Sequence, residues 1–388
     1  MDYWTSYIAE MKERDLYRKP ISYQPIDAVH IEEQGQRYLL LATNNYLGLT
    51  HCTAVKQAAM DAAMRYGTGS GGARLTTGNH ILYEQLEREL ARFKGTEAAL
   101  VFNTGYMANV GVLSAVVNQG DVVFSDELNH ASIIDGCRLS KGKTIVYRHA
   151  DIGHLAELLE STPCLGKRLI VTDGVFSMDG DIAPLDKIVE VAEEYKAIVM
   201  VDDAHAVGVL GNGGRGTVDY FGLKGRVEIQ IGTLSKSLAS EGGYVAGSQQ
   251  LIQYLVNKAR SFIFSTALAP ATVAAGLAAL QELQSTPELV DTLSANADYM
   301  RTALSSIGLQ VGDTVTPIIP IMVGEAALAV EMAQQLKQEG LIVSAIRPPT
   351  VMPGTSRLRL TVSAAHDKEE LVKAVEILTK VSKNLNLI

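Results

Sequence analysis

Lys236 is the residue whose type and surroundings most directly indicate covalent chemistry. It stands in GTLSKSLASEGG, residues 232–243, directly after the alternating run 227–231 that predicts a strand. A lysine at a strand end, among small residues and hydroxyls, can form a Schiff base when its amine is neutral. A solvated surface lysine is the alternative. A phosphate-binding P-loop does not fit, because the position before the lysine is Ser rather than Gly.

A second polar strand end, VDDAHAVG at residues 201–208, places Asp202 and His205 close together in sequence. Three interpretations are open: a solvated strand end with a helix cap, a metal site, or an acid held against a heterocyclic nitrogen. No second His or Cys stands nearby in sequence, which disfavours the metal. Pyridoxal phosphate (PLP) requires an acid at its pyridine nitrogen and a lysine at its aldehyde. Asp202 and Lys236 together therefore predict PLP.

Further strand ends add polar residues of matching chemistry. In FNTGYMAN, residues 102–109, a strand gives way through Thr104 and Gly105 to a helix whose first amides suit a phosphate, although a cap without a ligand fits equally. His130, in DELNHAS, follows another strand. Arg357 and Arg359 share one face of a strand by period two, as a carboxylate clamp or as a solvated face.

The glycine-rich stretch GTGSGG, residues 67–72, has the GxGxxG spacing of a dinucleotide site. Residues 54–66 before it predict a helix, whereas a dinucleotide fold requires a strand there. We therefore expect a loop that lies close to a ligand or to another subunit. An NAD-dependent oxidoreductase and a nucleotide-binding regulatory module are the competing functions from other classes.

Short apolar runs alternate with helical patterns between about residues 50 and 285, which predicts a mostly parallel sheet in an α/β/α sandwich. We expect three regions: 1–49, an N-terminal helix (residues 1–19, ended by Pro20) and substrate-channel segment; 50–285, a large domain; and 286–388, a smaller α+β domain. The expected strands of the large domain are 98–103, 121–125, 144–147, 168–172, 197–202, 227–232 and 243–247. The expected elements of the small domain are helices 287–306, 325–339 and 368–384 and strands 316–323, 341–346 and 357–363.

Composition excludes several classes of protein. The 388 residues are 47% hydrophobic and 20% charged, as in a globular chain, and the net charge of −9 argues against general nucleic-acid binding. No apolar run spans a membrane, and the charged N-terminus lacks a signal core, so a cytoplasmic location is expected. Cys52, Cys137 and Cys164 form no CxxC pair and are expected to be reduced structural thiols.

At this point the sequence resembles the α-oxoamine synthases, a family of fold-type I PLP-dependent transferases. The similar segments are GSGGARLTTG, LNHASIIDG, TDGVFSMDGDIAPL, VDDAHAVGVLG, GTLSKS and SRLRLTVSAAH, and matches run from residue 44 to 366. The resemblance implies a homodimer with its sites at the subunit interface. AIRPPTV, residues 345–351, together with GSGGARLTTGN, most resembles the members that condense L-alanine with a pimeloyl thioester in biotin biosynthesis. The thiol carrier is CoA or a carrier protein, and a glycine-using or broad-specificity member (2-amino-3-ketobutyrate CoA ligase type) is the alternative.

The resemblance also implies a role for each residue around the cofactor ring. Lys236 would bond to PLP and act as acid and base at the substrate α-carbon. Asp202 would pair with the pyridine nitrogen, and His205 would hydrogen-bond the phenolic oxygen. His130 would stack on the ring, and Ser177 would contact its phenolic side.

The remaining carried-over residues divide between phosphate and substrates. The phosphate would be met by Thr104, Gly105, Tyr106 and Thr233 of one subunit and by Thr266 of the second subunit. The amino-acid carboxylate would be bound by Arg359, the acyl substrate would be bordered by Asn44 and Thr350, and the far carboxylate of the acyl chain would be met by Arg18. Glu241, close to the cofactor lysine, has no assigned role.

Overall fold

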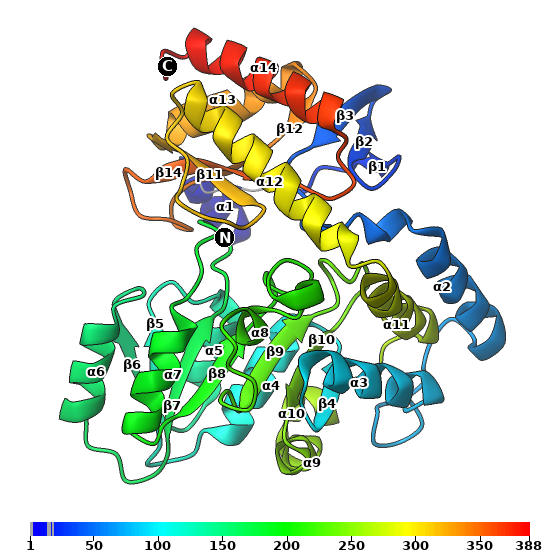
Figure 1. The fold of residues 1–388 in the computed structure, drawn as a ribbon, viewed down its shortest axis with the longest axis vertical. Coiled ribbons are helices and arrows are strands. Elements are labelled where there is room, and N and C mark those ends of the chain that lie inside the picture. Colours follow the sequence, from blue (N-terminus) through cyan, green and yellow to red (C-terminus); the bar gives the residue numbers. More distant parts are fainter. Residues whose placement is uncertain (1–2, 14–16, 18) are drawn as a thin grey trace.

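The computed structural model describes residues 3–13, 17 and 19–388 (Figure 1). Helix α1 covers Tyr3–Glu13 of the helix expected over residues 1–19. Arg18, the expected contact of the acyl carboxylate, lies outside the described residues.

The centre of the large domain is a seven-stranded sheet in the order β4-β10-β9-β8-β7-β5-β6. The pairings from β6 through to β9 are parallel, and β10 is antiparallel to both β9 and β4. This confirms the predicted mostly parallel sheet. The strands are β4 (Ala98–Phe102), β5 (Val122–Asp126), β6 (Lys143–Tyr147), β7 (Arg168–Asp173), β8 (Ile198–Asp202), β9 (Ile229–Thr233) and β10 (Gly243–Gly247).

Helices cover both faces of this sheet because neighbouring strand residues point to opposite sides. Val123 packs in one buried cluster with residues of α4 and α5, whereas Phe124 packs in another with residues of α6 and α7. The strands are consequently apolar on both faces, as expected for a buried parallel sheet. The helices of the large domain are α2 (Thr53–Tyr66), α3 (Ile81–Lys94), α4 (Gly105–Val116), α5 (Ala131–Leu139), α6 (Ile152–Ser161), α7 (Leu185–Glu194), α8 (Thr217–Tyr220), α9 (Gln249–Lys258), α10 (Arg260–Ile263) and α11 (Pro270–Ser285).

The C-terminal part forms a smaller α+β unit above the large domain in Figure 1. Its three-stranded antiparallel sheet has the order β11-β14-β13. Its elements are α12 (Glu288–Ser306), β11 (Ile318–Gly324), α13 (Ala326–Gln338), β12 (Leu341–Ile342), β13 (Ser344–Ile346), β14 (Ser356–Thr361) and α14 (Lys368–Asn384).

The prediction of one strand over residues 341–346 was wrong, because the chain divides there between two sheets. Residues 344–346 pair with β14, whereas β12 pairs in parallel with β3. β12 thereby completes a four-stranded sheet with strands that the sequence analysis did not anticipate: β1 (Gln24–Pro25), β2 (His30–Glu33) and β3 (Gln36–Leu40). Pairing partners so distant along the chain are decided by tertiary contacts rather than by local pattern.

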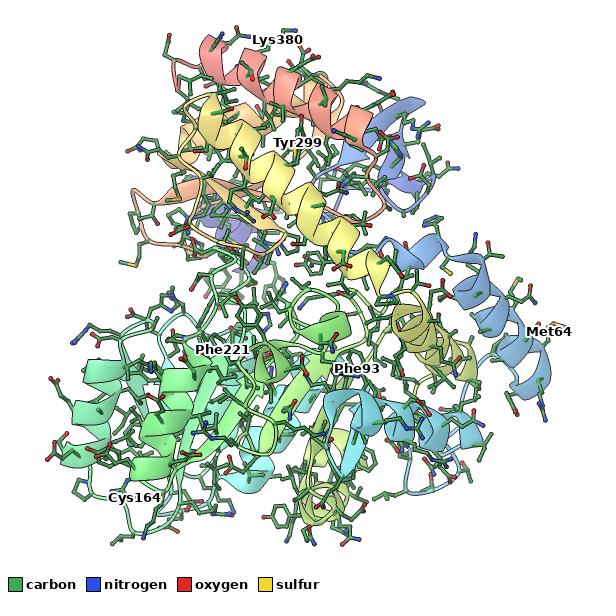
Figure 2. All side chains as sticks on the ribbon, viewed as in Figure 1. Met64, Phe93, Cys164, Phe221, Tyr299 and Lys380 are labelled. Carbon is green, nitrogen blue, oxygen red and sulfur yellow. The ribbon has the colours of Figure 1, made fainter. Side chains whose placement is uncertain are left out.

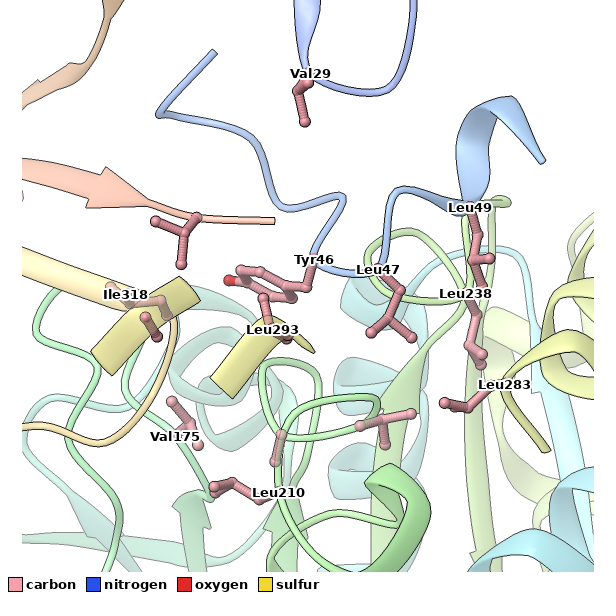
Figure 3. Close-up of a cluster of buried hydrophobic side chains, with 14 of the residues drawn as sticks. Val29, Tyr46, Leu47, Leu49, Val175, Leu210, Leu238, Leu283, Leu293 and Ile318 are labelled. Carbon is pink, nitrogen blue, oxygen red and sulfur yellow. The ribbon is translucent and has the colours of Figure 1, made fainter. Parts of the chain in front are cut away.

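A continuous hydrophobic cluster joins the two units. Figure 3 shows Tyr46 near the centre of this cluster, with Ile318 of the small unit to one side and Val175 and Leu210 of the large domain below it. Tyr46 itself is fully buried. The segment after β3 is thus packed between the two units, which places its polar atoms close to the strand ends of the large domain.

Side chains fill the space around all of these elements, and their apolar members form the interior (Figure 2). Among the described residues, no helix combines the length and the apolar character needed to cross a membrane.

A buried ion pair of the large domain braces its sheet. Lys94 Nζ lies 2.7 Å from Asp203 Oδ2 and donates to the carbonyl oxygen of Arg215 at 2.6 Å, and both ionic side chains are at most 1% exposed. Asp203 Oδ1 accepts from Thr217 Oγ1 at 2.5 Å. The pair therefore ties the end of α3 to the loop after β8.

We expect Lys94→Met to lower the free energy of unfolding by about 3–5 kcal/mol, because it leaves the Asp203 carboxylate buried without its cation. Chemical denaturation of the variant measures this loss. The control is Lys187→Met, which removes an exposed i,i+3 pair with Glu190 and should leave the denaturation midpoint unchanged. Equal stability of the two variants would contradict the assignment.

Candidate active site

A cavity of about 210 Å³ opens at the carboxyl ends of the central strands, where ligands of open α/β sheets bind. It combines nine of the predicted site residues with other polar groups. The lining residues are Thr104, Gly105, Tyr106, Asn109, His130, Ser132, Asp173, Ser177, Asp202, Ala204, His205, Thr233, Ser235 and Lys236.

Asp202 is the fixed carboxylate of this cavity. It ends β8 and is 5% exposed. Its Oδ2 accepts from Asn109 Nδ2 at 2.6 Å, and its Oδ1 accepts from the backbone N–H of Ala204 at 2.9 Å. Asp203, one residue later, points instead to Lys94. Of the two adjacent acids, only Asp202 faces the cavity.

Lys236 follows β9 on a loop that its neighbours hold in place. Ser237 Oγ donates to the carbonyl oxygen of Val207 at 2.7 Å, and Leu238 is fully buried. Burial lowers the pKa of the Lys236 amine to about 8, because desolvation outweighs the opposing attraction of Asp202 and Asp173. A useful fraction of the amine is therefore neutral near physiological pH, as a Schiff-base lysine requires.

His205 is held by a tyrosine from the junction between the two units. Its Nδ1 lies 2.7 Å from the hydroxyl of Tyr46, whose oxygen also accepts from Arg359 Nη2 at 3.4 Å. The Tyr46 hydroxyl also donates to Asn44 Oδ1 at 3.4 Å. Burial first, and then the nearby Lys236 and Arg359 cations, hold the pKa of His205 well below its usual range. His205 is thus a neutral imidazole.

His130 and Asp173 form a second pair at the cavity. The backbone N–H of His130 donates to Asp173 Oδ2 at 2.7 Å, and His130 Nδ1 lies 2.7 Å from Ser132 Oγ. Burial lowers the pKa of His130. Burial, reinforced by the charge of Asp202, raises the pKa of the Asp173 carboxyl well above its ordinary value. A neutral ring is therefore presented to the cavity at pH 7.

The start of α4 forms the anion-binding end of the cavity. Thr104 caps this helix by accepting from the backbone N–H of Met107 at 3.0 Å, and the first turn of any helix leaves N–H groups without intrahelical partners. Thr233 Oγ1 lies 2.8 Å from Ser235 Oγ. A Cβ at Gly243 would come within 2.5 Å of the Thr104 carbonyl oxygen, so the backbone of β10 must be glycine where it passes this loop.

Arg359 reaches the site from β14 and is 6% exposed. Its Nη2 donates to Asn44 Oδ1 at 3.2 Å, and its Nε donates to the carbonyl oxygen of Ser177. Arg357, on the same strand face, pairs instead with Asp179. The two arginines predicted to share a face therefore separate into one near the reacting centre and one bracing the adjoining loop.

Besides Asn44 and Arg359, two more of the described predicted residues lie apart from the cavity lining, and Tyr106 stands at its edge. Thr350 lines a second cavity of about 260 Å³, which shares Ser177 with the first. Thr266 forms a bridge with Ala73 of the glycine-rich loop. Tyr106 is 46% exposed, and its hydroxyl donates to Asp135 at 2.5 Å. Their roles stay predictions.

Sequence reasoning missed the residues that orient the expected ones. Asn109 lies one helical turn after Gly105, so helical periodicity alone could have found it. Asp173 directly ends β7, the same strand-end pattern that singled out Asp202. Tyr46 could not have been found, because its hydroxyl meets His205 across 159 residues.

The chemistry of this donor set fits PLP. The start of α4 with its nearby hydroxyls suits a phosphate, Asp202 suits a protonated pyridine nitrogen, and the low pKa of Lys236 suits an aldehyde. The imidazole of His130 supplies a flat surface for the ring. The glycine-rich stretch follows a helix and ends it at Gly67, which excludes the strand–turn–helix context of a dinucleotide site.

The low pKa of Lys236 predicts selective reactivity in the protein without cofactor. Reductive methylation across pH, read by peptide mass spectrometry, should show a midpoint near 8 for Lys236, whereas exposed Lys187, whose pKa is raised by Glu190, should titrate above 10.5. Asp202→Asn should move the Lys236 midpoint downward, because Asp202 favours the charged amine.

Between pH 8 and 10.5 the unfolded chain binds more protons at Lys236 than the folded chain does, so the contribution of Lys236 to stability rises with pH. Identical midpoints for both lysines would contradict this account.

The chain is similar to known proteins over most of its length. The family model "Aminotransferase class I and II" matches residues 36–378. An 8-amino-7-oxononanoate synthase from Lysinibacillus sphaericus is 50% identical, covering 97% of each chain, and one from Thermoanaerobacter pseudethanolicus is 46% identical, covering 100% of this chain and 98% of that protein.

Solved structures with the same fold include serine palmitoyltransferase from Sphingomonas wittichii. It is 30% identical with a TM-score of 0.96, and the match covers 100% of both chains. A structure of SPT with PLP is 31% identical with a TM-score of 0.95, covering 100% of this chain and 98% of that one. The 8-amino-7-oxononanoate synthase of Francisella tularensis is 30% identical with a TM-score of 0.76, covering 90% of this chain and 99% of that one.

Proposed function

The chain belongs to the aminotransferase class I and II family, and from this premise we propose that it condenses L-alanine with a pimeloyl thioester in a PLP-dependent, decarboxylating reaction. This is the activity of an 8-amino-7-oxononanoate synthase. The observation that supports it most strongly is the near full-length identity of 45–50% to relatives of that name. The buried lysine, acid and imidazoles of one cavity supply the residues that such chemistry needs.

When bound, PLP supplies an electron sink that stabilises negative charge at the substrate α-carbon. Asp202 would hold a proton on the ring nitrogen, because its carboxylate is buried and fixed by Asn109 and Ala204. The imidazole of His205, held by Tyr46, would hydrogen-bond the phenolic oxygen. His130 would cover the ring face, and the start of α4 would bind the phosphate.

Lys236 is the acid and base of the reaction. With its pKa lowered to about 8, the amine accepts the α-proton of alanine and returns a proton after CO2 has left. Arg359 binds the alanine carboxylate through its guanidinium fork, close to the bonds that break. Burial of Arg359 excludes water from this contact and strengthens it.

The second cavity suits the acyl chain. It lies beside the first through Ser177, and its lining is mainly apolar, with Leu128, Phe176, Met178, Val351 and Met352 beside Thr350. A pimeloyl chain presents several methylene groups, each stabilised by about 0.8 kcal/mol when it leaves water. Asn44, hydrogen-bonded to Arg359, stands close to where the thioester carbonyl and the carboxylate would meet.

We propose that the active enzyme is a homodimer. Met64 at the outer end of α2 (Figure 2) is 88% exposed, and Leu75, three residues after the glycine-rich stretch, is 52% exposed. A subunit interface would remove these two apolar side chains from water. Thr266, beside the same loop, would reach the phosphate of the partner's site.

Lys236→Ala should abolish turnover, since both the covalent anchor and the proton carrier are removed. The purified wild-type protein should be yellow, and borohydride should remove the colour and leave PLP on the peptide that contains Lys236. Mass spectrometry of the digested protein checks this assignment, with Lys187→Ala as the control. Full activity of Lys236→Ala would refute the proposed chemistry.

A substrate panel tests which condensation the site performs. Alanine, glycine and serine are each combined with pimeloyl, acetyl and succinyl thioesters of CoA and of acyl carrier protein, and CO2 release is measured. We expect the highest kcat/KM for alanine with a pimeloyl thioester. A preference for glycine with acetyl-CoA would instead establish the 2-amino-3-ketobutyrate CoA ligase type of reaction.

A further inference from the structure

A histidine outside the catalytic cavity is bonded to two carboxylates at once. His149 Nδ1 lies 3.0 Å from Asp126 Oδ1, and its Nε2 lies 2.9 Å from Asp181 Oδ2. A neutral imidazole has only one N–H, whereas ionised carboxylates accept and do not donate. Two such bonds therefore require an imidazolium cation. Consistently, the hydrogen bonds and charges of Asp126 and Asp181 overcome desolvation and raise the pKa of His149 to about 10.

The first of these carboxylates is itself fixed. Asp126 ends β5, is 3% exposed, and accepts from the backbone N–H groups of Leu128 and Ala150, both at 2.9 Å. Glu127 Oε1 accepts from the backbone N–H of His149 at 2.8 Å. The imidazole is thus anchored to the central sheet.

The second carboxylate belongs to a tight loop, residues 176–181. The N–H of Phe176 donates to the carbonyl oxygen of Asp181 at 3.0 Å, and the N–H of Gly180 donates to that of Phe176 at 2.8 Å. Because the loop closes on itself, movement of Asp181 displaces Phe176 and Ser177. The His149 ring also packs edge-on against Phe176, with centroids 4.4 Å apart.

This loop separates the two cavities of the site. Ser177 lines both, and Phe176, Met178 and Asp179 line the second. Contacts from the small unit hold its other side: Arg359 bonds the Ser177 carbonyl oxygen and Arg357 pairs with Asp179. The loop is therefore held between an anchored cation of the large domain and two arginines of the small one.

We propose that His149, as an imidazolium bridging Asp126 and Asp181, is a positioning residue that holds loop 176–181 between the cofactor cavity and the acyl cavity. This proposal rests on the proposed function. It states that the shape of the acyl cavity depends on His149, a residue that would contact neither substrate nor cofactor. The charges facing it are the carboxylates of Asp126, Asp181, Glu127 and Asp179, the last already paired with Arg357.

The charge state of His149 can be measured without any substrate. In protein labelled with ¹⁵N at histidine, the imidazole resonances that disappear in His149→Gln identify this residue. They should remain those of a doubly protonated ring through pH 8. Titration near the ordinary value of 6.5 would overturn the proposal, and this result does not depend on which substrates the enzyme uses.

The positioning role is tested by kinetics and absorption of the holoenzyme. His149→Gln should raise KM for pimeloyl-CoA by about 10-fold or more, since small displacements of positioning groups are costly, with a smaller change in kcat. The pH midpoint of the cofactor absorption band should also shift, because Ser177 lies at the cofactor cavity. The matched control is His154→Gln, which should leave both values unchanged, because the His154 ring accepts from the backbone N–H of Arg148 at 3.0 Å and does not bond to loop 176–181.

Asp181→Asn completes a double-mutant cycle. If the ionic bridge is responsible, the KM effects of His149→Gln and Asp181→Asn should be strongly non-additive in the double variant. Additive effects, or a lowered melting temperature with unchanged KM and absorption midpoint, would overturn the proposal. If the substrate panel favoured another thioester, the absorption and NMR results would still decide the role of His149.

Discussion

The structure depends on keeping a fraction of one lysine amine uncharged by burying it beside Asp202 and Asp173. Burial lowers the pKa of Lys236, whereas Asp202 and Asp173 oppose the shift, so the degree of burial sets the balance. Burial itself is produced by the neighbours of the lysine: Leu238 is in the core and the Ser237 hydroxyl bonds to the Val207 carbonyl. The packing of the loop after β9 therefore sets the pKa on which the chemistry of Lys236 depends.

Two adjacent acids at the end of β8 have different roles, one in the reactive cavity and one in the stability of the fold. Asp202 and Asp203 are adjacent and chemically identical, but one faces the cavity while the other neutralises Lys94 in the interior. A buried ion pair contributes little net stability, although losing one partner is costly. In this protein the Lys94–Asp203 pair fixes the loop after β8, and with it the orientation of Asp202 and His205.

Contacts between the two units complete the site. Arg359 comes from the small unit, Asn44 and Tyr46 from the segment packed between the units, and His205 from the large domain. None of these groups could be oriented within its own element alone. The hydrophobic cluster around Tyr46 (Figure 3) therefore has a chemical consequence as well as a structural one, since it brings together polar groups from three parts of the chain.

The sequence by itself determined the strands of the large sheet and the polar residues at their ends, because burial on both faces and strand-to-loop transitions leave local patterns. It also determined that the glycine-rich stretch follows a helix. Motif resemblance assigned the roles around Lys236. Only the tertiary structure decided that Asp203 pairs with Lys94, that residues 341–346 divide between two sheets, and that Asn44 meets Arg359 across 315 positions. These outcomes depend on contacts between residues far apart in the chain, and such contacts leave no local pattern in the sequence.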